Sequence, residues 1–251
     1  MTEPATVEDD VGGIALSPDL DLDALKQVWA RDGRLHIANV LAPPCAERIA
    51  RALETRTVWS LTANAAGEVF EMPLDRLAEL DPAERARIEA ITADGSLERM
   101  QYLYETWRVS FFVDHGMREG GAVEDLYDFL NGEAFLGFVR ELTGDERAAF
   151  SDAQATRYRP GHFLTTHDDT SAGRHRLCAY VLNFTRRWRP DWGGLLQFYD
   201  ESGNVEAGFT PAFNALNLFS VPRAHAVSYV APFAQGERLS VTGWVRARPT
   251  E

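Results

Sequence analysis

Two histidines and an aspartate have the residue types and the spacing to bind a metal ion. His167 and Asp169 lie two positions apart in Thr-His-Asp-Asp (166–169), and His225 follows 58 residues after His167. Residues i and i+2 of a strand point to one face, so we expect His167 and Asp169 to converge and Asp168 to point away. We therefore predict a metal site formed by His167, Asp169 and His225.

The donor set indicates which chemistry such a site supports. Two histidines and one carboxylate occupy three coordination positions and leave others for a cosubstrate and oxygen, as in non-haem Fe(II) oxygenases. A His-x-Asp triplet alone arises often by chance. Here a strand-rich interval separates it from a histidine that opens a predicted strand over 225–232. The alternative is an accidental triplet, or a structural metal in a binding domain.

A basic residue follows the last candidate ligand. Arg238 lies 13 residues after His225, and a strand, turn and strand between them would bring it back beside the His225 strand. An arginine inside a barrel needs a partner, because an unpaired buried charge is costly. A ligand carboxylate would satisfy it by a two-point contact. The alternative is a surface arginine paired with Glu237 or solvent, and Arg246 is the second candidate for the same role.

Helical patterns dominate the first part of the chain. Apolar residues recur at helical spacing in 20–31 and in two segments that end at Gly132 and Gly144. Asp-Pro-Ala-Glu (81–84) has the capping residue, first-turn proline and third-position acid of a helix start. The aromatic-rich stretch over 96–107 also favours a helix. We expect its aromatic side chains to pack in the core, with a substrate wall as the alternative.

Short strands dominate the chain after Gly144. Six segments rich in β-branched and aromatic residues alternate with Pro, Gly, Asn and Asp. Helices first and strands second indicate an α+β fold, and this strand spacing suggests a barrel or a jelly roll. We predict a mobile acidic tail over 1–17 and a single domain over 18–251. Helices mainly within 20–145 are expected to buttress strands mainly within 150–248.

The composition of the chain limits the binding partners and the cellular compartment that we expect for the protein. The 251 residues include 25 basic and 38 acidic side chains, and the net charge of −13 disfavours nucleic-acid binding. No apolar run reaches membrane-spanning length, and the acidic start lacks the pattern of a signal peptide. The chain has two cysteines, and we expect a cytoplasmic protein in which both thiols are reduced. We expect neither a nucleic-acid partner nor a membrane partner. The sequence does not predict an oligomeric state.

Short motifs flank the candidate ligands on both sides. A tyrosine, Tyr158, and a Pro-Gly pair, Pro160-Gly161, precede His167 and Asp169. Three motifs follow them: Leu182-Asn183, Trp192 and Gly193-Gly194-Leu195. Together with the three candidate ligands and Arg238, these motifs resemble those of the Fe(II)/2-oxoglutarate-dependent dioxygenases, most closely those of the prolyl-4-hydroxylase-like branch. The resemblance covers roughly 150–248 well, and 60–140 match less specifically.

The resemblance implies a fold, cofactors and ligands. The fold is a double-stranded β-helix, or jelly roll, buttressed by N-terminal helices. Fe(II) is held by His167, Asp169 and His225. The cosubstrates are 2-oxoglutarate and O2, with ascorbate as an optional stimulant.

The resemblance also assigns the cosubstrate contacts. Arg238 is the salt-bridge partner of the distal carboxylate of 2-oxoglutarate, and Tyr158 donates a hydrogen bond to the same carboxylate. Tyr180 is a further candidate, unless Val181 takes the inward position on that strand.

The implied reaction hydroxylates an unactivated C–H bond of a prolyl residue in a protein or peptide, with succinate and CO2 as coproducts. A free amino acid or another small molecule is the alternative substrate. A non-enzymatic jelly-roll binding domain is the alternative from another class, although such a domain has no need for Arg238 or Tyr158 inside the barrel.

Overall fold

The computed structural model describes residues 13–56, 58–65, 68–94 and 100–249. The helices are α1 (Leu22–Asp32), α2 (Pro43–Thr55), α3 (Leu74–Glu79), α4 (Pro82–Asp94), α5 (Val109–Asp114), α6 (Ala122–Leu130) and α7 (Glu133–Thr143), with a 3-10 turn, η1, at Pro190–Trp192. The strands are β1 (Arg34–Ala38), β2 (Ser60–Ala65), β3 (Glu68–Pro73), β4 (Tyr102–Trp107), β5 (Phe150–Ser151), β6 (Gln154–Tyr158), β7 (Phe163–His167), β8 (Arg176–Asn183), β9 (Leu196–Tyr199), β10 (Val205–Phe209), β11 (Ala215–Ser220), β12 (His225–Val227) and β13 (Arg238–Arg246).

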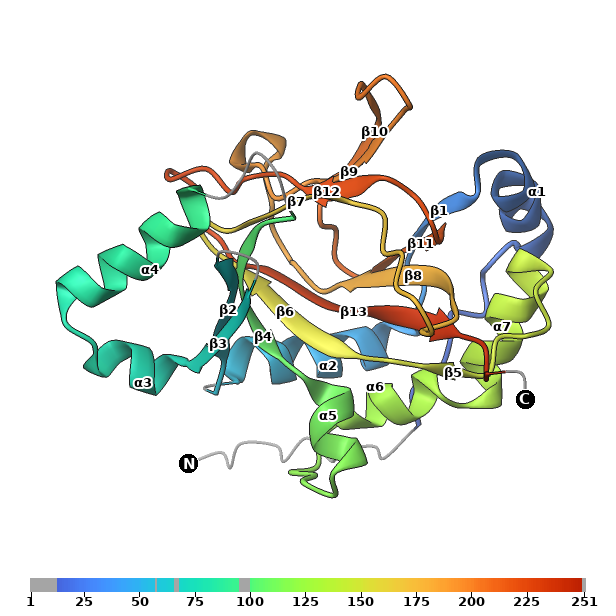
Figure 1. The fold of residues 1–251 in the computed structure, drawn as a ribbon. Helices are drawn as coiled ribbons and strands as arrows, with labels where there is room; N and C mark the ends of the chain where they lie inside the picture. Colours follow the sequence, from blue (N-terminus) through green and yellow to red (C-terminus); the bar gives the residue numbers. More distant parts are fainter. Residues whose placement is uncertain (1–12, 57, 66–67, 95–99, 250–251) are drawn as a thin grey trace, which may run out of the picture.

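The described strands form one antiparallel sheet that folds over on itself into two layers (Figure 1). The lower layer has the order β1-β11-β8-β13-β6, and the upper layer has the order β7-β12-β9-β10. Strand β4 pairs with β6 through Glu105–Trp107 and with β7 through Tyr102 and Leu103, so it joins the layers. The predicted α+β class and its double-stranded β-helix core are confirmed.

The helices cover the outer face of the lower layer, where Figure 1 places α2 and α6 beneath β13 and β6. Side chains of β8 alternate between the two faces, as a strand requires. Tyr180 and Leu182 pack with the helices in the main core, whereas Val181 packs on the inner face with Phe198 and Phe219. The space between the layers therefore receives every second residue of β8.

Several predicted helix boundaries are present. The carboxylate of Asp81 accepts hydrogen bonds from the backbone N–H groups of Ala83 and Glu84 at 2.8 and 2.9 Å, which fixes the start of α4. Helix α7 ends as Gly144 takes a left-handed conformation and donates its N–H to the carbonyl of Arg140.

The prediction of a helix over 96–107 is wrong for its described part. Residues 102–107 form strand β4, which pairs with β2 on one side and with β6 and β7 on the other. Aromatic residues and threonine fit a pleated surface, and pairing on both edges outweighs the weak helical preference of the segment. Residues 95–99 lie outside the described residues. A second element missed in this region is the β2–β3 hairpin.

The predicted mobile tail over 1–17 extends too far along the chain. Leu16 forms a β-bridge with Leu41, and the Ser17 N–H donates to the carbonyl of Val40 at 2.8 Å. Residues 1–12 lie outside the described residues. Among the helices that the structure describes, none combines the length and the apolar character needed to cross a bilayer.

Candidate active site

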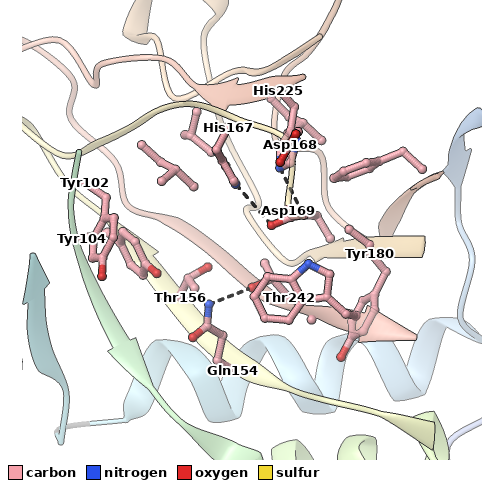
Figure 2. Close-up of a pocket in the computed structure, with 18 of the residues that line it drawn as sticks. Tyr102, Tyr104, Gln154, Thr156, His167, Asp168, Asp169, Tyr180, His225 and Thr242 are labelled. Carbon is pink, nitrogen blue, oxygen red and sulfur yellow. Dashed lines mark hydrogen bonds and ion pairs between the residues drawn. The ribbon is translucent and has the colours of Figure 1, made fainter. Parts of the chain in front are cut away.

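Three side chains converge between the two sheet layers (Figure 2). His167 is the last residue of β7 and His225 the first of β12, and the two face each other across the pairing of these strands. The carboxylate oxygens of Asp169 lie 3.4 Å from His167 Nε2 and 3.4 Å from His225 Nε2. One ligand atom from each residue falls within 4.8 Å of the others, so a single ion can contact all three.

The other ring nitrogen of each histidine is held by its own backbone. His167 Nδ1 lies 3.0 Å from the carbonyl of Thr165, and His225 Nδ1 lies 2.8 Å from the carbonyl of Arg223. A carbonyl only accepts, so each Nδ1 carries the proton and each Nε2 presents a lone pair. Burial, reinforced by the nearby His167, lowers the pKa of His225 to about 4. The imidazole is therefore neutral near pH 7, which is the metal-binding form.

Asp169 reaches the histidines from a turn. Its φ is 64°, in the left-handed region, and β7 has already ended at His167. Asp168 stabilises the turn, since its carboxylate accepts the N–H of Thr170 at 2.9 Å. The structure thus brings Asp169 rather than Asp168 to the histidines, but the reason predicted for this, strand alternation, is wrong.

The ionisation of Asp169 suits a cation. Burial raises the pKa of this carboxyl group, yet contacts with His167, His225 and the Trp244 indole outweigh burial and leave the pKa below its usual value. Two imidazole nitrogens and one carboxylate oxygen are the ligand set of a mononuclear Fe(II) site. These residues fit the metal, and they are the one such His, Cys, Asp or Glu cluster in the part of the chain described.

Arg238 lies in the same cavity without an acidic partner. It is the first residue of β13 and only 2% exposed, and its guanidinium carbon lies 4.8 Å from the centre of the Tyr158 ring. Burial lowers the pKa of Arg238, its Nε has no hydrogen-bond partner, and no described carboxylate lies within 4.0 Å of it. The alternative pairing with Glu237 is wrong, because Glu237 binds Arg157 and Arg159 instead. A buried cation in this state requires an anionic ligand.

Tyr158 is the cross-strand neighbour of Arg238. Burial raises the pKa of Tyr158 to about 12, although Arg238 opposes the shift. The phenol is therefore neutral and available as a hydrogen-bond donor near the guanidinium.

Tyr180 does not join this group. Its hydroxyl donates to the backbone carbonyl of Asp152 at 2.6 Å, and its ring packs edge-on against Phe135 of α7. Part of the ring borders the cavity, but the hydroxyl points away from Asp169 (Figure 2). The orientation of its hydroxyl speaks against the predicted cosubstrate contact of Tyr180, because strand alternation gives the inward position to Val181.

The cavity that holds these groups has a volume of about 390 Å³. Tyr102 and Tyr104 of β4 form a wall across from Asp169, and Tyr104 stacks on Tyr158 with 5.0 Å between ring centres (Figure 2). The expectation that these two tyrosines pack as a helix core is therefore wrong. Their i, i+2 spacing was the signal that could have placed both on one face of a strand.

Comparison with known proteins agrees with this geometry. Residues 153–246 match the family model of the 2OG-Fe(II) oxygenase superfamily, and this span contains the three converging residues, Arg238 and Tyr158. The resemblance found in the sequence motifs is thereby confirmed.

Among curated proteins, part of the chain resembles prolyl 3-hydroxylase OGFOD1 of Mus musculus. The two are 29% identical over 119 residues, which are 45% of this chain and 21% of OGFOD1. The similarity therefore spans about a fifth of the relative's length.

Solved structures share the fold over most of the chain. A prolyl-4-hydroxylase from Pseudomonas putida has a TM-score of 0.58 at 17% identity, covering 91% of this chain and 100% of that one. A prolyl hydroxylase from Trichoplax adhaerens, in complex with a hypoxia inducible factor peptide fragment, has a TM-score of 0.57 at 15% identity, covering 90% and 89%. The α-ketoglutarate-dependent epimerase SnoN from nogalamycin biosynthesis reaches 0.51 at 12% identity, covering 91% and 85%.

Proposed function

We propose that the protein is an Fe(II)- and 2-oxoglutarate-dependent dioxygenase that hydroxylates an unactivated C–H bond of a prolyl residue in a protein or peptide. One observation carries the proposal: a buried arginine without an acidic partner shares a cavity with two histidines and an aspartate that converge on one point. His167, Asp169 and His225 would hold the metal, and Arg238 would bind the far carboxylate of the cosubstrate.

The residues around the cosubstrate divide into polar and apolar groups. Arg238 supplies the charge and a planar two-point contact, and Tyr158 supplies a neutral hydroxyl beside it. Leu164, Leu196 and Val227 line the cavity with apolar surface that excludes water. The bound Fe(II) would supply the oxygen chemistry that couples decarboxylation of 2-oxoglutarate, to succinate and CO2, with hydroxylation of the substrate.

The substrate class rests on the aromatic wall and on the relatives. Tyr102 and Tyr104 offer flat apolar faces opposite the candidate metal ligands, a surface that suits a compact ring such as that of proline. OGFOD1 and two of the solved structures are prolyl hydroxylases by name, and one of them is in complex with a peptide.

A small-molecule substrate is the second candidate. The observation that favours it is the fold shared with SnoN, an epimerase from nogalamycin biosynthesis. A non-enzymatic binding domain is disfavoured, because a buried Arg238 without a carboxylate partner destabilises a protein that binds no anion.

Mass spectrometry of cellular proteins tests the substrate class. Cells with the wild-type protein are compared with cells that carry the His225→Ala variant, and the gain of one oxygen atom on proline is sought. The proposal expects at least one prolyl site that is modified only with the wild type. Purified enzyme that consumes 2-oxoglutarate with a small molecule and with no peptide would favour the second candidate.

The remaining sequence-based expectations stay predictions. They are a cytoplasmic location, stimulation by ascorbate, and the lack of nucleic-acid and membrane partners.

A further inference from the structure

The side chain of Arg176 contacts the one candidate metal ligand that lies outside a strand. Its Nη1 donates to the backbone carbonyl of Asp169 at 2.8 Å and lies 3.8 Å from the Asp169 carboxylate. No other described carboxylate lies within 4.0 Å of Arg176, and its Nε is buried with no partner. Asp169 is thus the one acidic partner of this arginine among the residues described.

Trp244 of β13 lies against the guanidinium group of Arg176. The guanidinium carbon of Arg176 lies 3.5 Å from the Trp244 ring centre, which fixes the plane of the guanidinium. Arg176 therefore contacts both the backbone carbonyl and the carboxylate of Asp169, and Trp244 supports the guanidinium that makes these contacts.

This contact crosses between the two layers. His167 and His225 belong to the upper layer, whereas Arg176 and Trp244 belong to the lower layer, which also carries Arg238. Asp169 has φ 64° and lies beyond the end of β7, so no strand pairing fixes its position. Contacts from other elements therefore help to place it.

We propose that Arg176, supported by Trp244, is a positioning residue that holds Asp169 in the geometry in which it binds the metal. The pair sets where the third ligand lies relative to the two histidines and relative to Arg238. The inference rests on the proposed function, because it takes Asp169 to be a metal ligand.

Arg246 provides a matched control. It is the cross-strand neighbour of Arg176, it is similarly buried, and it lies over an aromatic ring, that of Phe150. Its ion pair is with Asp152 at 3.2 Å, and it has no contact with Asp169. Loss of Arg246 removes a similar side chain from the same place and leaves Asp169 untouched.

The test is anaerobic calorimetric titration of metal-free full-length protein with Fe(II). Arg176→Met is expected to bind Fe(II) about 10- to 100-fold more weakly than wild type, which is the usual effect of losing an outer partner of a ligand. Arg176→Lys should recover part of the loss, because it keeps a charged donor without the planar stacking on Trp244. Arg246→Met should match the wild type. If circular dichroism shows that Arg176→Met is not folded, Arg176→Gln replaces it with the same expected loss.

Two results would overturn the inference. One is a Fe(II) affinity of Arg176→Met equal to that of the wild type, and the other is an equal loss in Arg246→Met, which would indicate general destabilisation. A wild-type protein that binds no Fe(II) would instead contradict the proposed function itself.

Discussion

At the scale of single residues, Arg238 and Asp169 have environments that suit bound ligands. Arg238 is an arginine with no acid beside it and 2% of its surface exposed. Asp169 is an aspartate in a left-handed turn whose oxygens face two imidazoles. Each arrangement has a folding cost that the bound anion or cation would offset.

Replacement of Arg238 tests the anion site. Arg238→Ala should raise the apparent KM for 2-oxoglutarate roughly 100-fold or more, since loss of one partner of a desolvated charge pair costs about 2–5 kcal/mol and each 1.4 kcal/mol is tenfold. Arg238→Lys should recover only part of the loss. Fe(II) affinity should barely change. Steady-state kinetics and metal titration measure the two effects, and an unchanged KM in Arg238→Ala would refute the assignment.

The neighbouring aspartates provide a second residue-scale prediction. Asp169→Ala should weaken Fe(II) binding by more than about 100-fold, beyond the usual effect of an outer-sphere change. Asp168→Ala should retain most of the affinity, because its carboxylate only stabilises the turn through Thr170. Calorimetric titration with Fe(II) measures the affinity of both variants. The reverse order of affinities would show that Asp168 is the ligand.

At the scale of elements, the turn between β6 and β7 contains a buried histidine. His162 Nδ1 accepts the N–H of Arg159 at 3.2 Å, and the carbonyl of His162 accepts the N–H of Val230 at 2.9 Å. Burial lowers the pKa of His162 to about 4 from an ordinary value of 6.5. The turn therefore depends on a neutral imidazole.

Acid should weaken the fold through His162. Between about pH 6.5 and pH 4 the unfolded chain binds a proton that the folded protein does not, so the free energy of unfolding falls as the pH falls. The shift corresponds to a loss on the order of 3 kcal/mol. His162→Asn keeps an acceptor for Arg159 and should lose about that much less over this range. Urea denaturation of metal-free protein at both ends of the range measures the difference, and parallel profiles would contradict the prediction.

The Gly-Gly-Leu motif has a structural explanation at the same scale. Gly193 has φ 69°, and a Cβ there would lie 1.9 Å from the carbonyl oxygen of Tyr229, in the segment between β12 and β13. Gly203 has a similar φ of 82°, but a Cβ there would meet nothing within 4 Å.

Alanine substitutions at Gly193 and Gly203 distinguish the free-energy cost of backbone strain from the cost of a steric clash. Gly203→Ala should cost about 1–2 kcal/mol of unfolding free energy, from backbone strain alone. Gly193→Ala adds a backbone collision and should cost about 3 kcal/mol or more. Urea denaturation gives both values, and equal losses would mean that the segment around Tyr229 moves freely aside.

The sequence predicted most strands after Gly144 because period-two patterns and turn residues mark them clearly. It failed at β4, where the aromatic run is short and the i, i+2 spacing of Tyr102 and Tyr104 was its one signal of a strand. It left Tyr180 and Val181 open, because a slip of one residue exchanges the two faces of a strand. Asp169 in its turn is contacted by Arg176, whose guanidinium lies over the Trp244 ring of β13, and no local sequence pattern marks these contacts.

At the scale of the whole molecule, the site depends on both sheet layers at once. The upper layer contributes His167 and His225, and the lower layer contributes Arg238 and Tyr158. Helices cover the lower layer from outside, and β4 joins the two layers (Figure 1). Tyr102 and Tyr104 of β4 line the cavity between the layers. Metal and cosubstrate would therefore meet only in the fully folded protein.

The most direct test of this account is the oxygen-dependent conversion of 2-oxoglutarate to succinate by purified protein loaded with Fe(II). The wild type should form succinate in air and none under argon. His225→Ala, which removes one candidate ligand, should form none in either condition while remaining folded by circular dichroism. Succinate formation by His225→Ala at the wild-type rate, or its absence from the wild type in the presence of peptides and small molecules, would contradict the account.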